Sequence, residues 1–217
     1  MAVLLGVSVA SNVSVPTWQS FDAMTGVQVV LTELIIGIGS GLILTIWFSA
    51  ALLAGEKIAA SAGLGFAAQM DPDSGGQTPV VSKIFSLFLT VLFLSWNGHL
   101  VVLDAILDTY QFLPVGNVPN LKVLITGGLS TAGSMFAAAT IIMLPVTGFL
   151  VAINLAIGVI SRSSPQMNLF AVGFPISMIV VFVLLYMWVD VLGYSLTDLS
   201  RSGVDSVRSV LGKMING

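Results

Sequence analysis

Long apolar blocks, separated by short polar connections, make up most of the chain. Four such blocks are poor in charged residues, at positions 27–53, 84–107, 123–161 and 163–189. The last two contain 39 and 27 residues and no charged side chain. Each block is long enough to cross a bilayer as a helix, which takes ~20 apolar residues. The pattern therefore predicts an all-α fold of hydrophobic helical hairpins.

The two uncharged blocks contain residues that interrupt helices. Pro145 lies inside the 39-residue block, and a proline within a helix removes one backbone hydrogen bond and bends the helix. We therefore expect either one bent helix or a hairpin of two shorter ones. In the 27-residue block, Gly173-Phe174-Pro175 is expected to break the segment. A broken helix at membrane depth must line a cavity or be covered by protein.

Three polar connections, at residues 55–83, 112–122 and 161–168, are rich in turn-forming residues. The C-terminal stretch 196–215 differs, because apolar residues at helical spacing leave the other face charged. We expect an amphipathic helix there, outside the hydrocarbon. It lies either on a membrane or partner surface or against its own protein. No internal repeat is visible, and one domain over residues 1–217 is expected.

Composition decides which class of protein carries these blocks. Of the 217 residues, 56% are hydrophobic and 8% are charged, against roughly a quarter charged in soluble domains. Both a soluble globular protein and a disordered one are thereby excluded. A net charge of −3 leaves no basic patch for nucleic acid. The chain has no cysteine and one histidine, so thiolate chemistry is excluded and no metal or cofactor is expected.

The connection at residues 55–83 carries the most distinctive residues. Glu56 and Lys57 directly follow an apolar stretch and are interpreted as an anchor at the membrane interface. A run of glycines and bulky apolar residues comes next, followed by an Asp-Pro turn. The candidate gate residues of this run are Gly63, Leu64, Gly65, Phe66, Met70, Asp71 and Pro72.

Two interpretations of this run stay open. The simpler one is a flexible loop between two helices. The other is a mobile apolar constriction, in which glycines provide backbone freedom and the Leu, Phe and Met side chains form a deformable seal. A calcium loop of the EF-hand type is excluded, because Ser82 stands where that motif requires Glu.

Polar residues near or within the apolar blocks are the remaining candidates. Asn97 and His99 lie deep in the block 84–107, where such groups face protein or water and are hydrogen-bonded. A hydrogen bond between helices of neighbouring subunits is favoured over a proton relay. Arg162 and Gln166 lie in the connection 161–168, which forms either a hairpin tip at the headgroups or part of a cavity wall. We interpret these four residues, with Glu56, as assembly residues.

Three stretches, in this order, resemble the FliR family of flagellar export-gate proteins, whose counterpart in virulence type III secretion is the SctT family. The stretches are GEKIA…GFAAQMDPDSGGQTPVVSKIFSLFLTVLFLSWNGHL, LPVG and AIGVISRSSPQMNLFAVGFP. The resemblance covers residues 27 to about 194. The resemblance is specific because it rests on three stretches together and not on a single motif.

The resemblance implies a non-catalytic subunit for bacterial flagellum biogenesis. One such subunit would join five FliP-like and four FliQ-like subunits and form the entrance of the protein export channel in the inner membrane, at the flagellar basal body. FlhB-like and FlhA-like proteins and unfolded export substrates are the other implied partners. The family's plug loop maps onto residues 62–78, which would seal the closed pore. Family members usually carry a further N-terminal hydrophobic segment, which this chain is expected to lack.

A secondary transporter or ion-channel subunit is the alternative, with broken helices at Pro145 and Pro175 forming a binding site. The scarcity of charges inside the apolar blocks and the lack of a repeat weigh against it. A membrane-embedded enzyme is disfavoured, because no apolar block contains a carboxylate pair, a Ser/His pair or a set of metal ligands.

Overall fold

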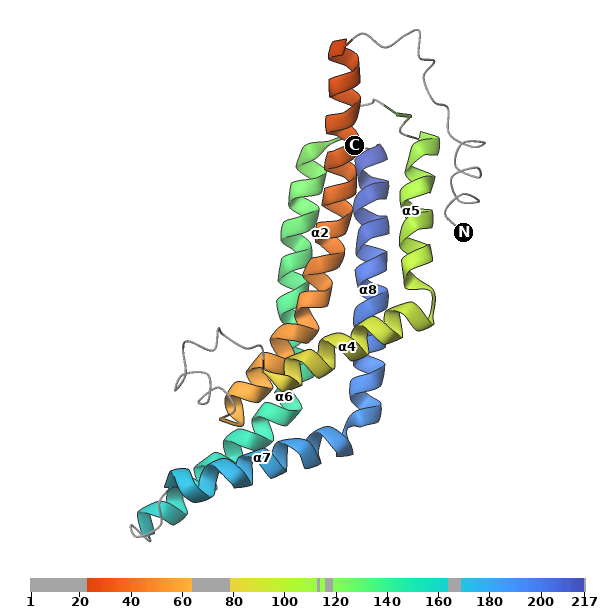
Figure 1. Ribbon diagram of the computed structural model, residues 1–217. Helices are drawn as coiled ribbons and strands as arrows, with labels where there is room; N and C mark the ends of the chain where they lie inside the picture. The colour runs from red at the N-terminus through yellow and green to blue at the C-terminus, as the bar shows by residue number, and fades with distance from the viewer. Residues whose placement is uncertain (1–22, 64–78, 113, 116–118, 164–168, 217) are drawn as a thin grey trace. The chain divides into compact units, whose positions relative to one another are not determined.

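A computed structural model describes residues 23–63, 79–112, 114–115, 119–163 and 169–216. These residues form helices and no strand (Figure 1). The helices are α2 (Ala23–Ser61), α4 (Val80–Ser95), α5 (Gly98–Phe112), α6 (Leu121–Ser163), α7 (Leu169–Met187) and α8 (Val189–Asn216). The prediction of an all-α fold is confirmed.

The two internal prolines do not end their helices. Pro145 lies inside α6, a continuous helix of 43 residues, so the first alternative holds and the hairpin of two shorter helices does not form. Pro175 lies inside α7. The expected break at Gly173–Pro175 is therefore wrong. Pro175 is exposed, so its ring and the missing backbone donor are accommodated at a helix surface that no other described element covers.

The real interruptions lie elsewhere. The block 84–107 is divided into α4 and α5 at Trp96 and Asn97. The last apolar segment is divided from the C-terminal helix at Trp188, between α7 and α8. Two helix spans among the described residues are long and apolar enough to cross a membrane, Gly26–Ser61 and Leu121–Ile160. The number rises to four if each of the two bent pairs, α4 with α5 and α7 with α8, counts as one span.

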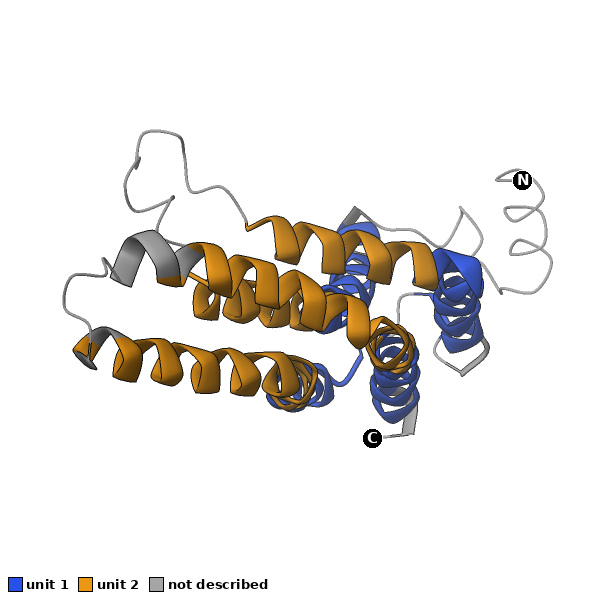
Figure 2. Ribbon diagram, turned by 90° about the horizontal axis from the view of Figure 1, so that it is seen from below, with its two compact units in different colours: residues 1–47, 93–133, 200–217 blue, residues 48–92, 134–199 orange. Residues whose placement is uncertain are grey.

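The chain divides into two compact units, which Figure 2 colours separately. Unit 1 comprises residues 1–47, 93–133 and 200–217, so its described part contains the first half of α2, all of α5, the start of α6 and the end of α8. The apolar stripe of α8 supplies much of its core. The buried members of that stripe within unit 1 are Val204, Val207, Val210, Leu211 and Met214.

Unit 2 comprises residues 48–92 and 134–199. Its core is built around the second half of α2, which buries a face made mainly of alanines. The buried apolar residues on this part of α2 are Ala50, Ala51, Ala54, Ile58 and Ala59, and Ala62 directly after the helix is buried as well. Helix α4 contributes Val81, Phe85 and Leu89 to the same core.

Both units expose large apolar side chains. On α2 of unit 1 they include Met24, Val27, Leu31, Leu34, Ile38 and Leu42, and on α6 and α7 of unit 2 they include Phe136, Ile141, Leu155, Val159, Ile179 and Phe182. Monomeric soluble proteins rarely expose contiguous apolar patches of this extent. The chain alone therefore covers only part of its apolar surface.

Candidate functional site

Helix α2 ends at a glycine in the left-handed conformation. Gly63 has φ 80°, a backbone state that a residue without Cβ adopts without steric penalty. The Gly63 N–H donates to the Ala60 carbonyl at 3.0 Å, and the Ala62 N–H donates to the Ile58 carbonyl at 3.0 Å. This is the usual way in which a helix closes at a C-terminal glycine. The predicted gate segment therefore leaves α2 through a defined cap.

Gly63 is the one predicted gate residue on which the structure reports. Leu64, Gly65, Phe66, Met70, Asp71 and Pro72 lie outside the described residues, as does Gln166. The site is therefore built from the helices on either side of the segment 64–78.

The two helices that flank this segment approach each other at backbone distance. A Cβ atom on Gly55 of α2 would lie 2.5 Å from Cα and 2.8 Å from the backbone nitrogen of Ser82 on α4. Ser82 is fully buried, and its hydroxyl has no hydrogen-bond partner among the described residues. Gly55 of α2 is therefore in close contact with α4.

A polar bridge holds the end of α2 from a second direction. The Asn154 side chain on α6 donates from Nδ2 to the Ser61 carbonyl at 3.2 Å. The Ser177 hydroxyl on α7 donates to Asn154 Oδ1 at 3.0 Å. Asn154 therefore connects three helices of unit 2. Sequence reasoning missed it, although it is the one amide side chain in the uncharged block 123–161.

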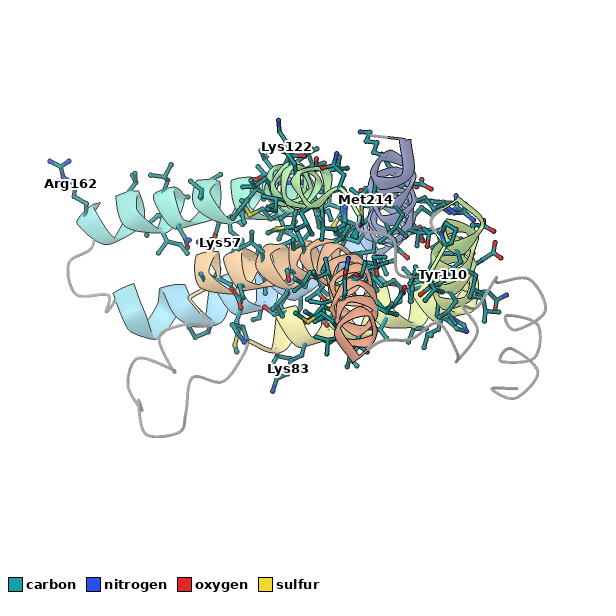
Figure 3. The ribbon with its side chains drawn as sticks, turned by 90° about the horizontal axis from the view of Figure 1, so that it is seen from above. Lys57, Lys83, Tyr110, Lys122, Arg162 and Met214 are labelled. Carbon is teal, nitrogen blue, oxygen red and sulfur yellow. The ribbon has the colours of Figure 1, made fainter. Side chains whose placement is uncertain are left out.

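The charged candidates lie at the surface of unit 2. Glu56 is half-buried, whereas Lys57, Lys83 and Arg162 are exposed. Figure 3 shows Lys83 and Arg162 extending away from the ribbon. Arg162 lies in the last turn of α6, where a positive charge interacts favourably with the helix dipole.

Asn97 has a backbone role in this chain. Its φ is 59°, and its carbonyl accepts hydrogen bonds from the backbone N–H groups of Leu100 and Val101 at 2.9 and 3.2 Å. Asn97 therefore starts α5. His99 is exposed, and its ring lies edge-on to Phe93 with 6.4 Å between centroids. The predicted bonds from Asn97 and His99 to neighbouring subunits stay predictions.

Further polar contacts join helices of unit 1. The Tyr110 hydroxyl donates to Glu33 Oε2 at 2.6 Å. The indole nitrogen of Trp47 donates to Ser206 Oγ at 2.8 Å, and that of Trp96 donates to Ser200 Oγ at 3.0 Å. Sequence reasoning did not pair these residues. The only available signal was Glu33, the single charge in the block 27–53.

Among the described residues, no three His, Cys, Asp or Glu side chains lie close enough together to hold a metal ion. The features that surround the end of α2 are a glycine cap, a backbone-close helix crossing and an amide bridge. Such an arrangement holds the end of α2 against α4 and α6.

Comparison with known proteins gives a consistent result. Residues 1–202 match the sequence model of the family Bacterial export proteins, family 1. The chain is 33% identical to the flagellar biosynthetic protein FliR of Escherichia coli (strain K12), over 83% of this chain and 69% of that protein. It is 28% identical to FliR of Bacillus subtilis (strain 168), over 82% and 70% of the two chains. It is also 32% identical to FliR of Aquifex aeolicus (strain VF5), over 71% and 60%.

The match to the family extends over most of the chain, and helices long and apolar enough to cross a membrane are what a membrane export component requires. This chain belongs to the FliR family of bacterial export proteins.

Proposed function

We propose that this component of the flagellar export apparatus forms the entrance of the export channel together with five FliP-like and four FliQ-like subunits. FlhB-like and FlhA-like proteins would be its further neighbours. Its place would be the bacterial inner membrane at the flagellar basal body. The chain would act sterically, without catalysis, on unfolded export substrates.

The observation that carries this proposal is the family match over residues 1–202. The exposed apolar surface supports it. Helices α2 and α6 contain 39 and 43 residues, which at 1.5 Å per residue correspond to about 60 Å each. A hydrocarbon core is only ~30 Å thick. A large part of each helix therefore extends beyond the hydrocarbon and needs protein partners to cover its apolar side chains.

We further propose that the segment 64–78 is the plug that seals the closed channel. The cap at Gly63 and the close approach of Gly55 to Ser82 support this, because they anchor both ends of the segment. A seal that must open for a substrate and then close again needs a flexible element on a rigid base. Leu64, Phe66 and Met70 would supply its apolar contacts.

The stoichiometry has a direct test. The tagged chain is co-expressed with FliP-like and FliQ-like proteins of the same source, and the purified complex is weighed by native mass spectrometry. One copy of this chain with five and four partner copies is expected. A stable homo-oligomer without partners would favour the alternative, a secondary transporter or ion-channel subunit, which flux assays would then examine.

The plug has a separate test. Residues 64–78 are replaced by a Gly/Ser segment of equal length, which provides a flexible connection and removes the apolar side chains. The complex is reconstituted in liposomes, and the release of a small trapped dye is measured. We expect assembly with unchanged stoichiometry and a large increase in dye release. Release equal to that of the unmodified complex would contradict the plug.

A further inference from the structure

Helix α8 has two different faces within unit 1. The apolar face is buried in the core of the unit and comprises Val204, Val207, Val210, Leu211 and Met214. The opposite face is exposed, and its side chains are charged or polar: Arg201, Asp205, Arg208, Ser209 and Lys213. Residues three or four positions apart share one side of a helix. These five residues therefore form one stripe along α8, with charges of both signs.

Helices α2 and α6 lie beside this part of α8. The indole nitrogen of Trp47 on α2 donates to Ser206 Oγ on α8 at 2.8 Å. A Cβ atom on Gly127 of α6 would lie 2.6 Å from a methyl group of Val210 on α8. Figure 1 shows α2 and α8 running side by side. The three helices therefore occupy the same level of unit 1.

The large side chains that α2 and α6 expose at this level are apolar. Ile38 and Leu42 on α2 are 58% and 57% exposed, and Ile125 and Leu129 on α6 are 63% and 69% exposed. The stretches 34–55 and 123–133 contain no charged residue. The same level of unit 1 thus presents an apolar surface on α2 and α6 and a charged surface on α8.

One surrounding medium does not suit both surfaces. An extended apolar surface needs lipid or another protein to cover it, whereas charged side chains are costly in hydrocarbon and need water. A subunit in the wall of a water-filled channel meets both conditions, because its outer side contacts lipid or neighbouring subunits and its inner side contacts water. Transmembrane barrels with aqueous interiors show the same division, with an apolar band outside and a polar lumen.

We propose that the charged stripe of α8 lines the water-filled passage of the export channel. This inference rests on the proposed function, because a channel places water at a level where the exterior of the assembly is apolar. The stripe suits the passage of an unfolded chain. An apolar wall would bind the apolar side chains of such a chain, whereas a hydrated wall with charges of both signs offers them no surface to bury against.

The test makes use of the absence of cysteine from this chain, so that one introduced cysteine is a unique label. The complete complex is assembled with cysteine-free partner subunits and reconstituted in liposomes. Asp205→Cys and Arg208→Cys report on the stripe. Ile38→Cys and Leu129→Cys are the matched controls, because they lie on the apolar surface at the same level and are equally exposed in the chain alone.

Each variant is treated with two thiol reagents, a small charged methanethiosulfonate and a maleimide carried on a bulky polyethylene glycol chain. We expect the small reagent to modify the two stripe variants at least about tenfold faster than the two controls, because the reactive thiolate is disfavoured in apolar surroundings. The bulky reagent should modify none of the four variants in the intact complex, since a narrow passage excludes it. After denaturation, both reagents should modify all four variants.

The outcomes separate this inference from the proposed function. If neither reagent modifies the stripe, another protein covers it; if both do, the stripe faces the water outside the channel. Either result refutes the inference, while an intact complex leaves the proposed function standing. If the unmodified chain does not assemble with its partner subunits, the proposed function is refuted and the inference with it. Ser209→Cys supplies a further position on the stripe if one of the other two variants does not assemble.

Discussion

In unit 1, side-chain hydrogen bonds join helices that are far apart in the sequence. Three of them are the bonds of Trp47 with Ser206, Trp96 with Ser200, and Tyr110 with Glu33. In unit 2, one helix contact is made at backbone distance. It places Gly55 of α2 directly against the backbone of Ser82 on α4. Polar side chains span the distance between helices in unit 1, as Asn154 does in unit 2, whereas the absence of a side chain at Gly55 lets two helix backbones of unit 2 meet directly.

The glycines show the same difference. In unit 1, a Cβ on Gly39 would meet the end of the Leu124 side chain at 2.7 Å, and a Cβ on Gly127 would meet a methyl group of Val210 at 2.6 Å. The end of a flexible side chain rotates away at small cost, whereas a backbone does not. The contact at Gly55 is therefore the least tolerant of the three. It joins the two helices that precede and follow the segment 64–78 in the sequence.

The largest expected effect comes from filling this contact. Gly55→Val should lower the free energy of unfolding of the detergent-purified chain by about 3 kcal/mol, the upper end of the usual cost of overpacking. Gly148→Val is the control within unit 2, because nothing lies within 4 Å of a Cβ at that position, and it should change stability by less than about 0.5 kcal/mol. Equilibrium unfolding in sodium dodecyl sulfate, followed by circular dichroism, measures both. Equal losses in the two variants would show that α2 and α4 are not in backbone contact.

The second largest effect belongs to the carboxylate bond of unit 1. Tyr110→Phe removes the hydroxyl that bonds Glu33 at 2.6 Å, and we expect a loss of about 1.5 kcal/mol, the lower end for a hydrogen bond to a charged group. Tyr186→Phe is the control, since Tyr186 is 81% exposed. The same unfolding measurement applies. If Tyr110→Phe lowers the free energy of unfolding no more than Tyr186→Phe does, the hydrogen bond between Tyr110 and Glu33 does not stabilise unit 1.

The sequence predicted the helices better than their interruptions. Apolar blocks longer than a bilayer requires predict α-helices directly, and the family resemblance is confirmed over most of the chain. Pro175 was read as a break because a proline removes a backbone bond. The structure tolerates that loss at an exposed position of α7. The Asn-Gly dipeptide at the break between α4 and α5 favours turns, but the sequence interpretation did not use it and placed Asn97 within a continuous apolar block.

The residues around the end of α2 show which contacts a sequence pattern does not predict. Gly63 was identified from composition, and its left-handed φ of 80° gives it a definite place at the end of α2. Asn154 was not identified, because a single amide in an uncharged stretch has no local partner. Its partners Ser61 and Ser177 are 93 and 23 residues away. Only the packing of three helices brings them together.

A smaller effect is expected for the hydrogen bond between Trp47 and Ser206 in unit 1. Trp47 is buried, and Trp47→Phe also replaces its indole by a smaller ring, so the single substitution overstates the bond. A double-mutant cycle with Ser206→Ala isolates the interaction, and we expect a coupling free energy of about 1 kcal/mol, as for a neutral hydrogen bond. A coupling indistinguishable from zero would mean that the 2.8 Å contact adds nothing beyond packing.

The smallest expected effect separates the backbone of Asn97 from its side chain. Because φ is 59° at this position, Asn97→Ala should cost about 0.5 kcal/mol, since an alanine is less tolerant of the left-handed region than an asparagine. Asn97→Gly should retain the wild-type stability, since glycine adopts this backbone state freely. If both variants were equally destabilised, the amide itself would be required, and the predicted bond to a neighbouring subunit would gain support. If only the alanine variant is affected, Asn97 serves to begin α5 through its backbone conformation. Unit 1 then uses side-chain hydrogen bonds for the contacts between its helices and not for the turns that connect the helices.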